Sequence, residues 1–459
     1  MELLGSEQTQ YTTGSPHAGA FDTAGSFDMS STTNNTSSAA AHGVAAQRIA
    51  SSAQQRSGAC GGSPSGALGN ITNIATPLGG INTVTGEVLG GFFVARKWEL
   101  RAVARRVSPE RHRVHICMHN IRADRGEVEV KAGRGETGRG AYFAGLMTCG
   151  SVWVCPVCAA KIQAQRSVEV RAVIDAWVAR GGAVSMLTLT APHTRDDVLE
   201  DLLERFTSAQ RLLTKGSSWA RFKDRHGVRG YVKALEVTYG QENGWHVHSH
   251  WLLFSDSALG GYARSVVLQQ WRSACKRASI RGRLSAKHAV TLQDGAAVKT
   301  YVTKMGAEYT WSSEDELVRS HSKRGRGLRF TPFDLLALQL GEGSEALRLD
   351  GVARWIEYCE AFHGRMQMSW SRVGGTTFRK WLLGEAALER TDEELAASVN
   401  EADALLGAIT LQQWRVIRRQ NLQGDVLAVA DLHGVEGLEN FLAALPVDDV
   451  SGGGWHIFA

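Results

Sequence analysis

The sequence predicts an α+β chain from three features: an alternating histidine run, a cysteine-rich segment and several stretches with helical periodicity. Residues 244–254 read GWHVHSHWLLF, where histidines and β-forming apolar residues alternate as they do along a strand. Stretches with apolar residues three and four positions apart lie on both sides of this run and predict helices. A chain of 459 residues is long enough for several structural units.

Charge is unevenly distributed along the chain. Residues 1–90 carry two basic and five acidic residues, and residues 391–459 carry three basic and eleven acidic residues, so residues 91–390 have a net charge of +16. Such a field, in which Arg outnumbers Lys, favours a phosphate-rich partner, although a basic enzyme without such a partner would also fit. The sequence shows neither a run of about 20 apolar residues nor an export signal, so we expect a cytoplasmic protein.

Four cysteines have the spacing of a zinc site. Cys155 and Cys158 form a Cys-Pro-Val-Cys turn that offers two sulfurs to one ion, and Cys149 and Cys117 can complete a four-thiolate site. A redox pair is the alternative, but no βαβ pattern surrounds the turn. Cys117 is the least constrained of the four ligands. Three nearby histidines could replace it: His112, His115 and His119.

The remaining elements follow in chain order. Residues 1–90 are rich in small and polar residues, and we expect them to be disordered. The Arg-rich segment 96–113 could be a solvated helix face or a phosphate contact. Beyond it we expect helices at 159–180, 194–216, 265–276 and 296–305, strands at 183–192, 231–238, 244–254 and 289–292, a basic loop at 319–329, and helices through 333–390 and 391–445.

The alternating histidines predict a metal site. His246, His248 and His250 would project from one strand face, and imidazole nitrogens are common ligands for divalent ions. Glu236, on the neighbouring strand of the expected hairpin, is a candidate third ligand. The alternative for the histidines is a core strand with ordinary polar histidines. The alternative for Glu236 is an exposed strand carboxylate paired with a Lys or Arg residue.

Downstream, Tyr301 and Lys304 lie three residues apart and would share one helix face. With a divalent ion and a basic surround, this pair suggests attack of a tyrosine on a phosphodiester, with the lysine stabilising charge on the leaving oxygen. The products would be a 5′-phosphotyrosine and a free 3′ hydroxyl. The substrate would be single-stranded or extruded DNA, because a duplex hides the phosphate from a concave site. The basic loop could follow a DNA backbone or be simply solvated, and it contains four candidate DNA-binding residues: Lys323, Arg324, Arg326 and Arg329.

Three segments in order, Leu187–Thr190, Gly244–His250 and Tyr301–Lys304, resemble the motifs of rolling-circle plasmid replication initiators of the HUH endonuclease superfamily. The segments Cys149–Cys158 and Glu236–Gly240 look like those of a bacterial-plasmid branch, and the resemblance covers about residues 100–440. It implies an HUH fold, in which helices flank a central antiparallel sheet, a Cys-rich zinc module precedes the sheet and a helical C-terminal region follows it.

The same resemblance implies that His248 and His250 hold Mg²⁺ or Mn²⁺, that the cysteines hold Zn²⁺ and that Tyr301 is the nicking nucleophile. Origin DNA and a host helicase are the implied partners. The expected divisions are a disordered arm at 1–90, a zinc module at 91–160, a nicking domain at 161–310, a basic loop with a helical extension at 311–390 and an acidic helical region at 391–459.

The chain departs from the family pattern at two positions. Ser249 stands between the two ligands where the family usually has a hydrophobic residue, which would loosen the packing of the strand. Ala297 stands where some relatives carry the glutamate that activates the terminating attack, so Glu308 or Tyr309 would have to serve that step.

Two other classes of protein share part of this pattern. A transposase or a conjugative relaxase uses the same metal and tyrosine, but a relaxase usually has its tyrosine ahead of the histidines. A non-catalytic zinc-containing DNA-binding regulator would use the histidines only structurally. Loss of nicking with retained DNA binding in a Tyr301→Phe variant would separate these classes.

Overall fold

The computed structural model describes residues 91–133, 140–293, 295, 298, 329–341, 343–387 and 389–446. All of these residues belong to one compact unit of the chain. None of the described helices is both long and apolar enough to cross a lipid bilayer. Several positions singled out from the sequence lie outside the described residues: the arm at 1–90, Ala297, Tyr301, Lys304, Glu308, Tyr309, Lys323, Arg324 and Arg326.

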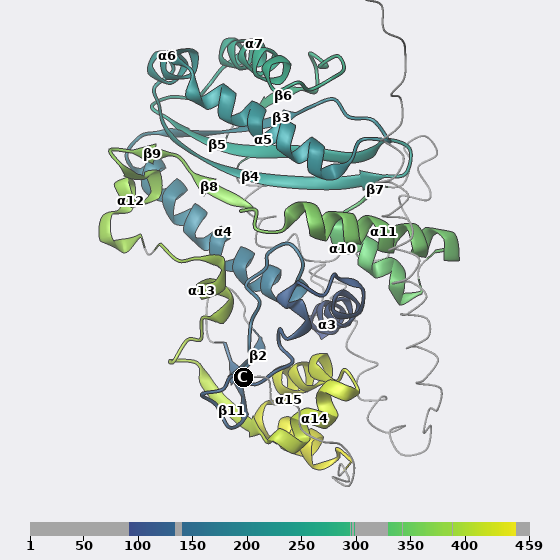
Figure 1. The fold of residues 1–459 in the computed structure, drawn as a ribbon. Helices are drawn as coiled ribbons and strands as arrows, with labels where there is room; N and C mark the ends of the chain where they lie inside the picture. The colour runs from purple at the N-terminus through teal and green to yellow at the C-terminus, as the bar shows by residue number, and fades with distance from the viewer. Residues whose placement is uncertain are drawn as a thin grey trace, which may run out of the picture. The chain divides into compact units, whose positions relative to one another are not determined.

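A central antiparallel sheet organises the fold (Figure 1). Its main path runs in the order β6-β3-β5-β4-β7, and β8 pairs with β4 beyond the end of β7. Every pairing in the sheet is antiparallel. The strands are β3 (Ala183–Thr190), β4 (Val228–Gly240), β5 (Gly244–Ser255), β6 (Val290–Gln293), β7 (Arg329–Phe330) and β8 (Met368–Trp370). The α+β class and the central antiparallel sheet expected from the sequence are therefore confirmed.

The hairpin between β4 and β5 is fixed by its turn. Gly244 adopts a φ of +73°, a left-handed conformation that residues with a Cβ atom rarely adopt. A Cβ at Gly244 would also lie 2.9 Å from the Cα of Arg195, closer than such atoms can pack. The turn sets the register, in which Glu236 faces His248 and Ala234 faces His250.

One face of the sheet is covered by three helices, α5 (Leu199–Lys215), α6 (Ser217–Arg225) and α7 (Gly261–Arg277), as Figure 1 shows. Aromatic side chains fill this layer: the rings of Phe206 and Trp271 meet edge to face at 5.5 Å, and those of Trp219 and Trp251 at 5.9 Å. Odd-numbered residues of β5, such as Trp251, point into this layer and leave the even-numbered histidines on the opposite face.

The opposite face packs on the long helix α4 (Pro156–Ala179) along part of its length. Val170 and Val173 of this helix join Met186 of β3 and Leu252 of β5 in one buried cluster. Near the end of the helix, the Trp177 indole nitrogen donates hydrogen bonds to the backbone oxygens of β3 and β5. The histidine half of this face lies outside that hydrophobic cluster.

The C-terminal region departs from the expected all-helical pattern. A strand, β11 (Ala404–Ile409), pairs antiparallel with β1 (Val128–Ala132), which also pairs with β2 (Ala141–Ala144) in a second, three-stranded sheet. This pairing joins segments far apart in the sequence, so no local pattern could reveal it. Three short strands also interrupt residues 333–390, which were expected to be helical.

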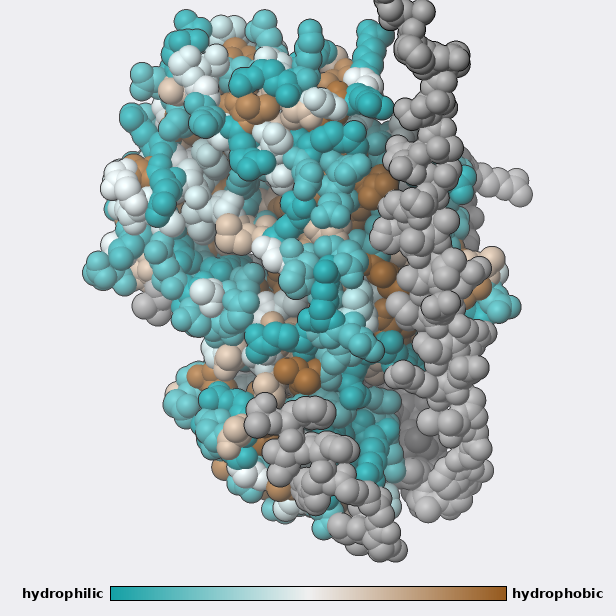
Figure 2. Space-filling view, in the orientation of Figure 1, coloured by the Kyte–Doolittle hydropathy of each residue, from teal (hydrophilic) through white to brown (hydrophobic). Residues whose placement is uncertain are grey.

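The other elements surround these two sheets. They are α3 (Gly91–Val107), η2 (Arg113–His115), α10 (Pro332–Ala337), η3 (Leu338–Leu340), α11 (Glu345–Phe362), β9 (Arg372–Val373), β10 (Thr376–Thr377), α12 (Phe378–Leu383), η4 (Gly384–Ala386), α13 (Asp392–Ala397), α14 (Leu411–Arg419) and α15 (Gln423–Ala443). Figure 2 shows that the described residues on one face are mostly hydrophilic, with hydrophobic residues in small separate groups.

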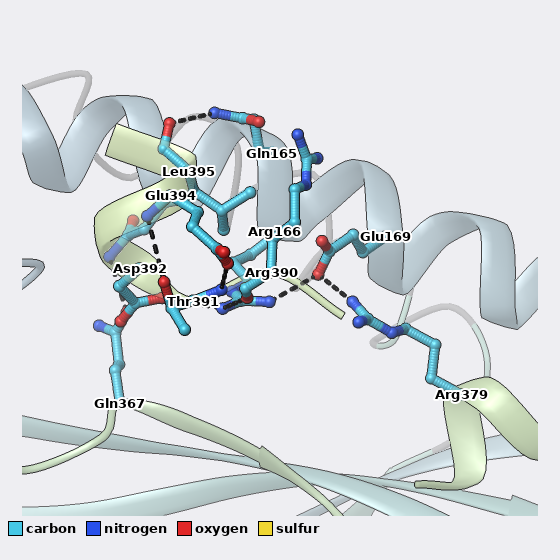
Figure 3. Close-up of polar contacts among 11 residues, drawn as sticks. Gln165, Arg166, Glu169, Gln367, Arg379, Arg390, Thr391, Asp392, Glu394 and Leu395 are labelled. Atoms are coloured by element: carbon cyan, nitrogen blue, oxygen red, sulfur yellow. Dashed lines mark hydrogen bonds and ion pairs between the residues drawn. The ribbon is translucent and has the colours of Figure 1, made fainter. Parts of the chain in front are cut away.

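A network of ion pairs ties α12 and α13 to α4 (Figure 3). Arg166 of α4 lies 2.9 Å from both the Glu169 and the Asp392 carboxylates. Glu169 also pairs with Arg379, whose side chain is almost fully buried. Because the buried Arg379 and the partly buried Arg166 share one carboxylate, Glu169 is the residue on which the network depends.

Candidate metal centres

Glu236, His248 and His250 bring three ligand atoms together on the even-numbered face of the central sheet. Glu236 Oε2 lies 3.1 Å from His248 Nε2 and 3.4 Å from His250 Nε2. All three ligand atoms lie within 4.8 Å of one another. One carboxylate and two imidazoles form a donor set that suits a divalent cation.

The charge of Glu236 also fits this role. Burial opposes ionisation of the carboxyl group, but hydrogen bonds from His248 and His250 outweigh that cost and hold the pKa of Glu236 well below its usual value. The group is therefore a carboxylate at neutral pH, as a metal ligand must be.

Thr188 orients one of the two imidazoles. Its hydroxyl lies 2.9 Å from the Nδ1 atom of His250, opposite which it stands in the β3–β5 register. This contact leaves the Nε2 atom directed at Glu236. Thr188 belongs to the Leu187–Thr190 segment, but nothing in that segment alone identified the threonine as a partner of the histidine.

Ser249 keeps its strand well packed, contrary to expectation. Its hydroxyl donates to the backbone oxygen of Ala234 at 2.8 Å and accepts from the Trp251 indole nitrogen at 2.8 Å. The serine is almost fully buried, and both hydrogen bonds compensate for the loss of water. The polar residue therefore links β5 to β4.

His246 points from the same strand face as the other histidines, but the structure does not bring it into the group of ligand atoms. Its Nδ1 atom lies 2.9 Å from Nε2 of His193, whose own Nδ1 atom lies 2.9 Å from the backbone oxygen of Asn243. Burial, together with the neighbouring His248 and His193, lowers the pKa of His246 to about 3. His246 is therefore a neutral member of a hydrogen-bonded chain that no motif in the sequence predicted.

A cavity of about 380 Å³ opens beside this histidine chain. His193 and His246 line it together with two cationic residues, Arg283 and Arg329. Arg329 was one of the four candidate DNA-binding residues and lies in β7, paired with Gly240 at the hairpin end of β4. Of those four residues, Arg329 alone belongs to the part of the chain that the structure describes.

The structure brings the four cysteines of the expected zinc module together. The Cys117 sulfur lies 3.6 Å from that of Cys155 and 3.4 Å from that of Cys158, and the sulfurs of Cys149 and Cys158 are 3.7 Å apart. These separations exceed the ~2.05 Å of a disulfide and are close to the ~3.8 Å that tetrahedral zinc, with its ~2.3 Å bonds to sulfur, requires. All four residues are buried, so the group fits a structural zinc ion.

Cys117 is the fourth member of this group rather than one of the three nearby histidines. His115 Nε2 lies 3.1 Å from the backbone oxygen of Pro109, and His119 Nδ1 lies 3.1 Å from the Asn120 side chain. His112 packs its ring against that of His363. Each histidine thus has another role.

Arg101 is an unexpected neighbour of the four sulfurs. Its side chain is only 1% exposed, and its Nε atom donates to the backbone oxygen of Cys117 at 3.0 Å. Burial lowers the pKa of Arg101, while the four nearby thiols act in the opposite direction. The sequence offered two readings of segment 96–113, a solvated face and a phosphate contact, and neither accounts for this buried arginine.

The fold and its two candidate metal centres define an α+β protein suited to divalent-cation chemistry. Residues 144–278 match the family model described as Replication protein. This match covers less than a third of the chain and agrees with the resemblance to replication proteins that the motifs suggested. The matched region holds Glu236, His248 and His250, as well as three of the four cysteines.

Two relatives come from Streptomyces. The Protein rep of Streptomyces lividans is 29% identical over 361 residues, which cover 64% of this chain and 77% of that protein. The Neomycin resistance protein of Streptomyces cyanogenus is 35% identical over 140 residues, which cover 25% of this chain and 32% of that protein. No solved structure matches the chain.

Proposed function

We propose that the chain is a rolling-circle plasmid replication initiator with an HUH-type nicking domain at residues 161–310. It would cut one strand of single-stranded or extruded origin DNA and later rejoin it. The observation that carries this proposal is the convergence of Glu236, His248 and His250 on one sheet face, inside the region that matches the replication protein family. A divalent cation held by these three residues would polarise the scissile phosphate and fix its orientation.

In this proposal Tyr301 is the nucleophile. Its phenol oxygen attacks the phosphorus and loses its proton to solvent, and a Tyr-O–P bond forms as the P–O3′ bond breaks. Lys304 stabilises the negative charge on the departing 3′ oxygen, which takes up a proton and becomes the 3′ hydroxyl primer. The phosphotyrosine retains the ester, so the reverse reaction can rejoin the strand. A host helicase would open the duplex ahead of the primer.

Val298 supports this placement of the tyrosine. It is helical and buried in the cluster that contains Met186 and Leu252, on the same sheet face as the metal ligands. Tyr301 follows three residues later, which is about one helical turn. A helix that continues past Val298 along this face would carry Tyr301 beside the ligands.

Arg283 and Arg329 support a DNA path next to the ligands. Both line the cavity that adjoins His246, and arginine pairs bidentately with phosphate oxygens. We propose that the strand to be cut passes through this cavity, with Lys323, Arg324 and Arg326 holding its backbone further along.

The test is covalent capture of DNA. The full-length chain is incubated with Mn²⁺ and labelled oligonucleotides that tile its plasmid origin, and adducts are resolved on a denaturing gel. We expect the wild-type chain and the control variant Tyr262→Phe to form an adduct, and Tyr301→Phe to bind the DNA without forming one. An adduct in Tyr301→Phe would overturn the nucleophile assignment. DNA binding without any adduct in the wild type would favour the zinc-containing regulator.

A further inference from the structure

A second basic cavity lies on the sheet face that points away from Glu236 and the histidines. It has a volume of about 700 Å³, and its floor is formed by Lys233, Leu235 and Ser249. These are odd-numbered residues of β4 and β5, so they point away from the even-numbered metal ligands. Helix α5 forms one wall of the cavity, and the residues that lead into β8 form the other wall. Strand β8 lies beside β4 in Figure 1.

Lys233 is the central feature of this cavity. Its ammonium nitrogen lies 5.6 Å from the centre of the Trp251 ring, the residue opposite it on β5. No carboxylate pairs with Lys233 among the described residues. Burial, followed by the neighbouring Arg211, lowers the pKa of Lys233. A half-buried ammonium beside a second cation is unfavourable unless an anion joins it.

The other residues of the cavity strengthen its positive field. Arg211 on α5 and Arg365 on the opposite wall both line it. Arg205 lines it too, but its charge is balanced by Asp197 at 3.1 Å. Glu204 is the carboxylate among the lining residues. The positive charge of the cavity, from Lys233, Arg211 and Arg365, therefore exceeds the negative charge of Glu204.

Neutral hydrogen-bond donors complete the site. The side-chain nitrogen of Gln210 is buried and has no hydrogen-bond partner among the described residues. Gln210 lines the same cavity, as do the hydroxyl-bearing residues Ser208 and Ser369. An unpaired buried donor is unfavourable, and a bound oxygen acceptor would remove that cost. Cations and donors without an excess of carboxylates suit an oxyanion and not a metal ion.

We propose that this cavity is a phosphate-binding site, with Lys233 and Arg211 as its cationic ligands and Gln210 as a neutral donor. The arginine guanidinium matches the geometry of phosphate oxygens, and the lysine supplies a point charge at the base of the cavity. The phosphate could belong to a DNA backbone or to a free phosphate compound. The site is separate from the proposed nicking site, because the two open on opposite faces of one sheet.

The first test measures thermal unfolding of the full-length chain in inorganic phosphate against chloride at equal ionic strength. We expect phosphate to raise the Tm of the wild type, since a ligand that binds the folded state stabilises it. In Lys233→Met the side-chain packing on Trp251 is retained, so we expect the Tm in chloride to stay the same or rise, and the phosphate-dependent rise to disappear.

A second variant tests the same proposal if Lys233→Met does not fold. Arg211→Gln changes an exposed helical residue, and Arg171→Gln on α4 is its matched control, because Arg171 is also exposed and lines none of the cavities described above. We expect Arg211→Gln to weaken phosphate affinity about tenfold, the effect of losing one charge-assisted hydrogen bond, and Arg171→Gln to leave it unchanged. Equal phosphate responses in all variants would overturn the proposal.

The source of the phosphate is identified with a fluorescent 12-nucleotide single-stranded DNA of arbitrary sequence. If a backbone phosphate occupies the cavity, Lys233→Met lowers the slope of log affinity against log salt by about 0.7, the contribution of one phosphate on a single strand. An unchanged slope together with a Tm response to inorganic phosphate identifies a free phosphate compound. Neither measurement depends on nicking, so failure of the proposed function would leave this result unaffected.

Discussion

Glu236 and His248 face each other across the β4–β5 pair, with the carboxylate oxygen 3.1 Å from the imidazole Nε2 atom. Because they lie on adjacent strands in direct register, the separation of their side chains is set by the sheet and not by a loop. His250 completes the group from the next position on the same face. The neighbouring His246 is directed instead to His193. This difference between two histidines of one strand can be tested directly.

We expect His248→Gln to lower the affinity for Mn²⁺ at this site by at least about 100-fold, since loss of a direct ligand should exceed the 10- to 100-fold effect of losing an outer partner. The matched variant His246→Gln should change the affinity by less than about threefold. Isothermal titration with Mn²⁺ measures both, after chelation of the weakly held metal. Equal losses in the two variants would show that His246 is a ligand.

Thr188→Val should weaken Mn²⁺ binding about 10-fold, because the hydroxyl that fixes the His250 ring is removed while the shape of the side chain is kept. Thr190→Val is the control. Thr190 lies on the same strand and face, but its hydroxyl donates to the backbone oxygen of His288. The same titration measures both variants. An unchanged affinity in Thr188→Val would mean that strand packing alone orients the imidazole.

The strand that carries His248 and the turn at Gly244 could be predicted from the sequence because both are local patterns. Alternation places His246, His248 and His250 on one face, and the turn brings Glu236 opposite them. The partner of each histidine could not be predicted, because it depends on side chains from other segments. Thr188 reaches His250 only through the β3–β5 register, and His193 reaches His246 from a loop.

The sequence also could not predict the role of residues that pack against distant segments of the chain. Arg101 looks like one of several surface arginines, yet it is buried against Cys117. Residues 404–409 lie in an acidic, Ala/Leu-rich segment that was expected to be helical, but the edge of β1 provides them with hydrogen-bond partners and they form β11. Pairing across such a separation leaves no signal in either segment alone.

Cys117→Ser should reduce the zinc bound after purification, which we expect to be one ion per chain in the wild type. Zinc supplies folding free energy on the order of 10 kcal/mol in small modules, so the midpoint of chemical unfolding should also fall clearly. Release of zinc to a chromogenic chelator measures the first effect. Cys275→Ser is the control, because Cys275 is buried elsewhere, where burial raises the pKa of its thiol to about 12. Full zinc in Cys117→Ser would exclude Cys117 as a ligand.

His112 should make the folded state sensitive to mild acid. Burial, and then the neighbouring His363, lower the pKa of His112 to about 4 from an ordinary value near 6.5. Between these values the unfolded chain binds the proton more readily, so this contribution to stability is complete above about pH 6.5 and is lost as the pH falls toward 4. Chemical unfolding at pH 7 and pH 5 should show a smaller loss of stability in His112→Phe than in the wild type. Equal losses would contradict this assignment.

Glu169→Gln should destabilise the fold by about 3–5 kcal/mol, the cost of leaving the buried Arg379 cation without its counter-ion. Arg379 would lose its carboxylate partner, and Arg166 would keep Asp392 and its hydrogen bond to the backbone oxygen of Arg390. Urea unfolding measures the change. The double variant Glu169→Met with Arg379→Met should recover part of the loss, because it removes the cation as well as the anion. Arg171→Gln, an exposed change on the same helix, should have little effect. If the double variant is less stable than Glu169→Gln, then Arg379 contributes through packing or other hydrogen bonds and not through its charge.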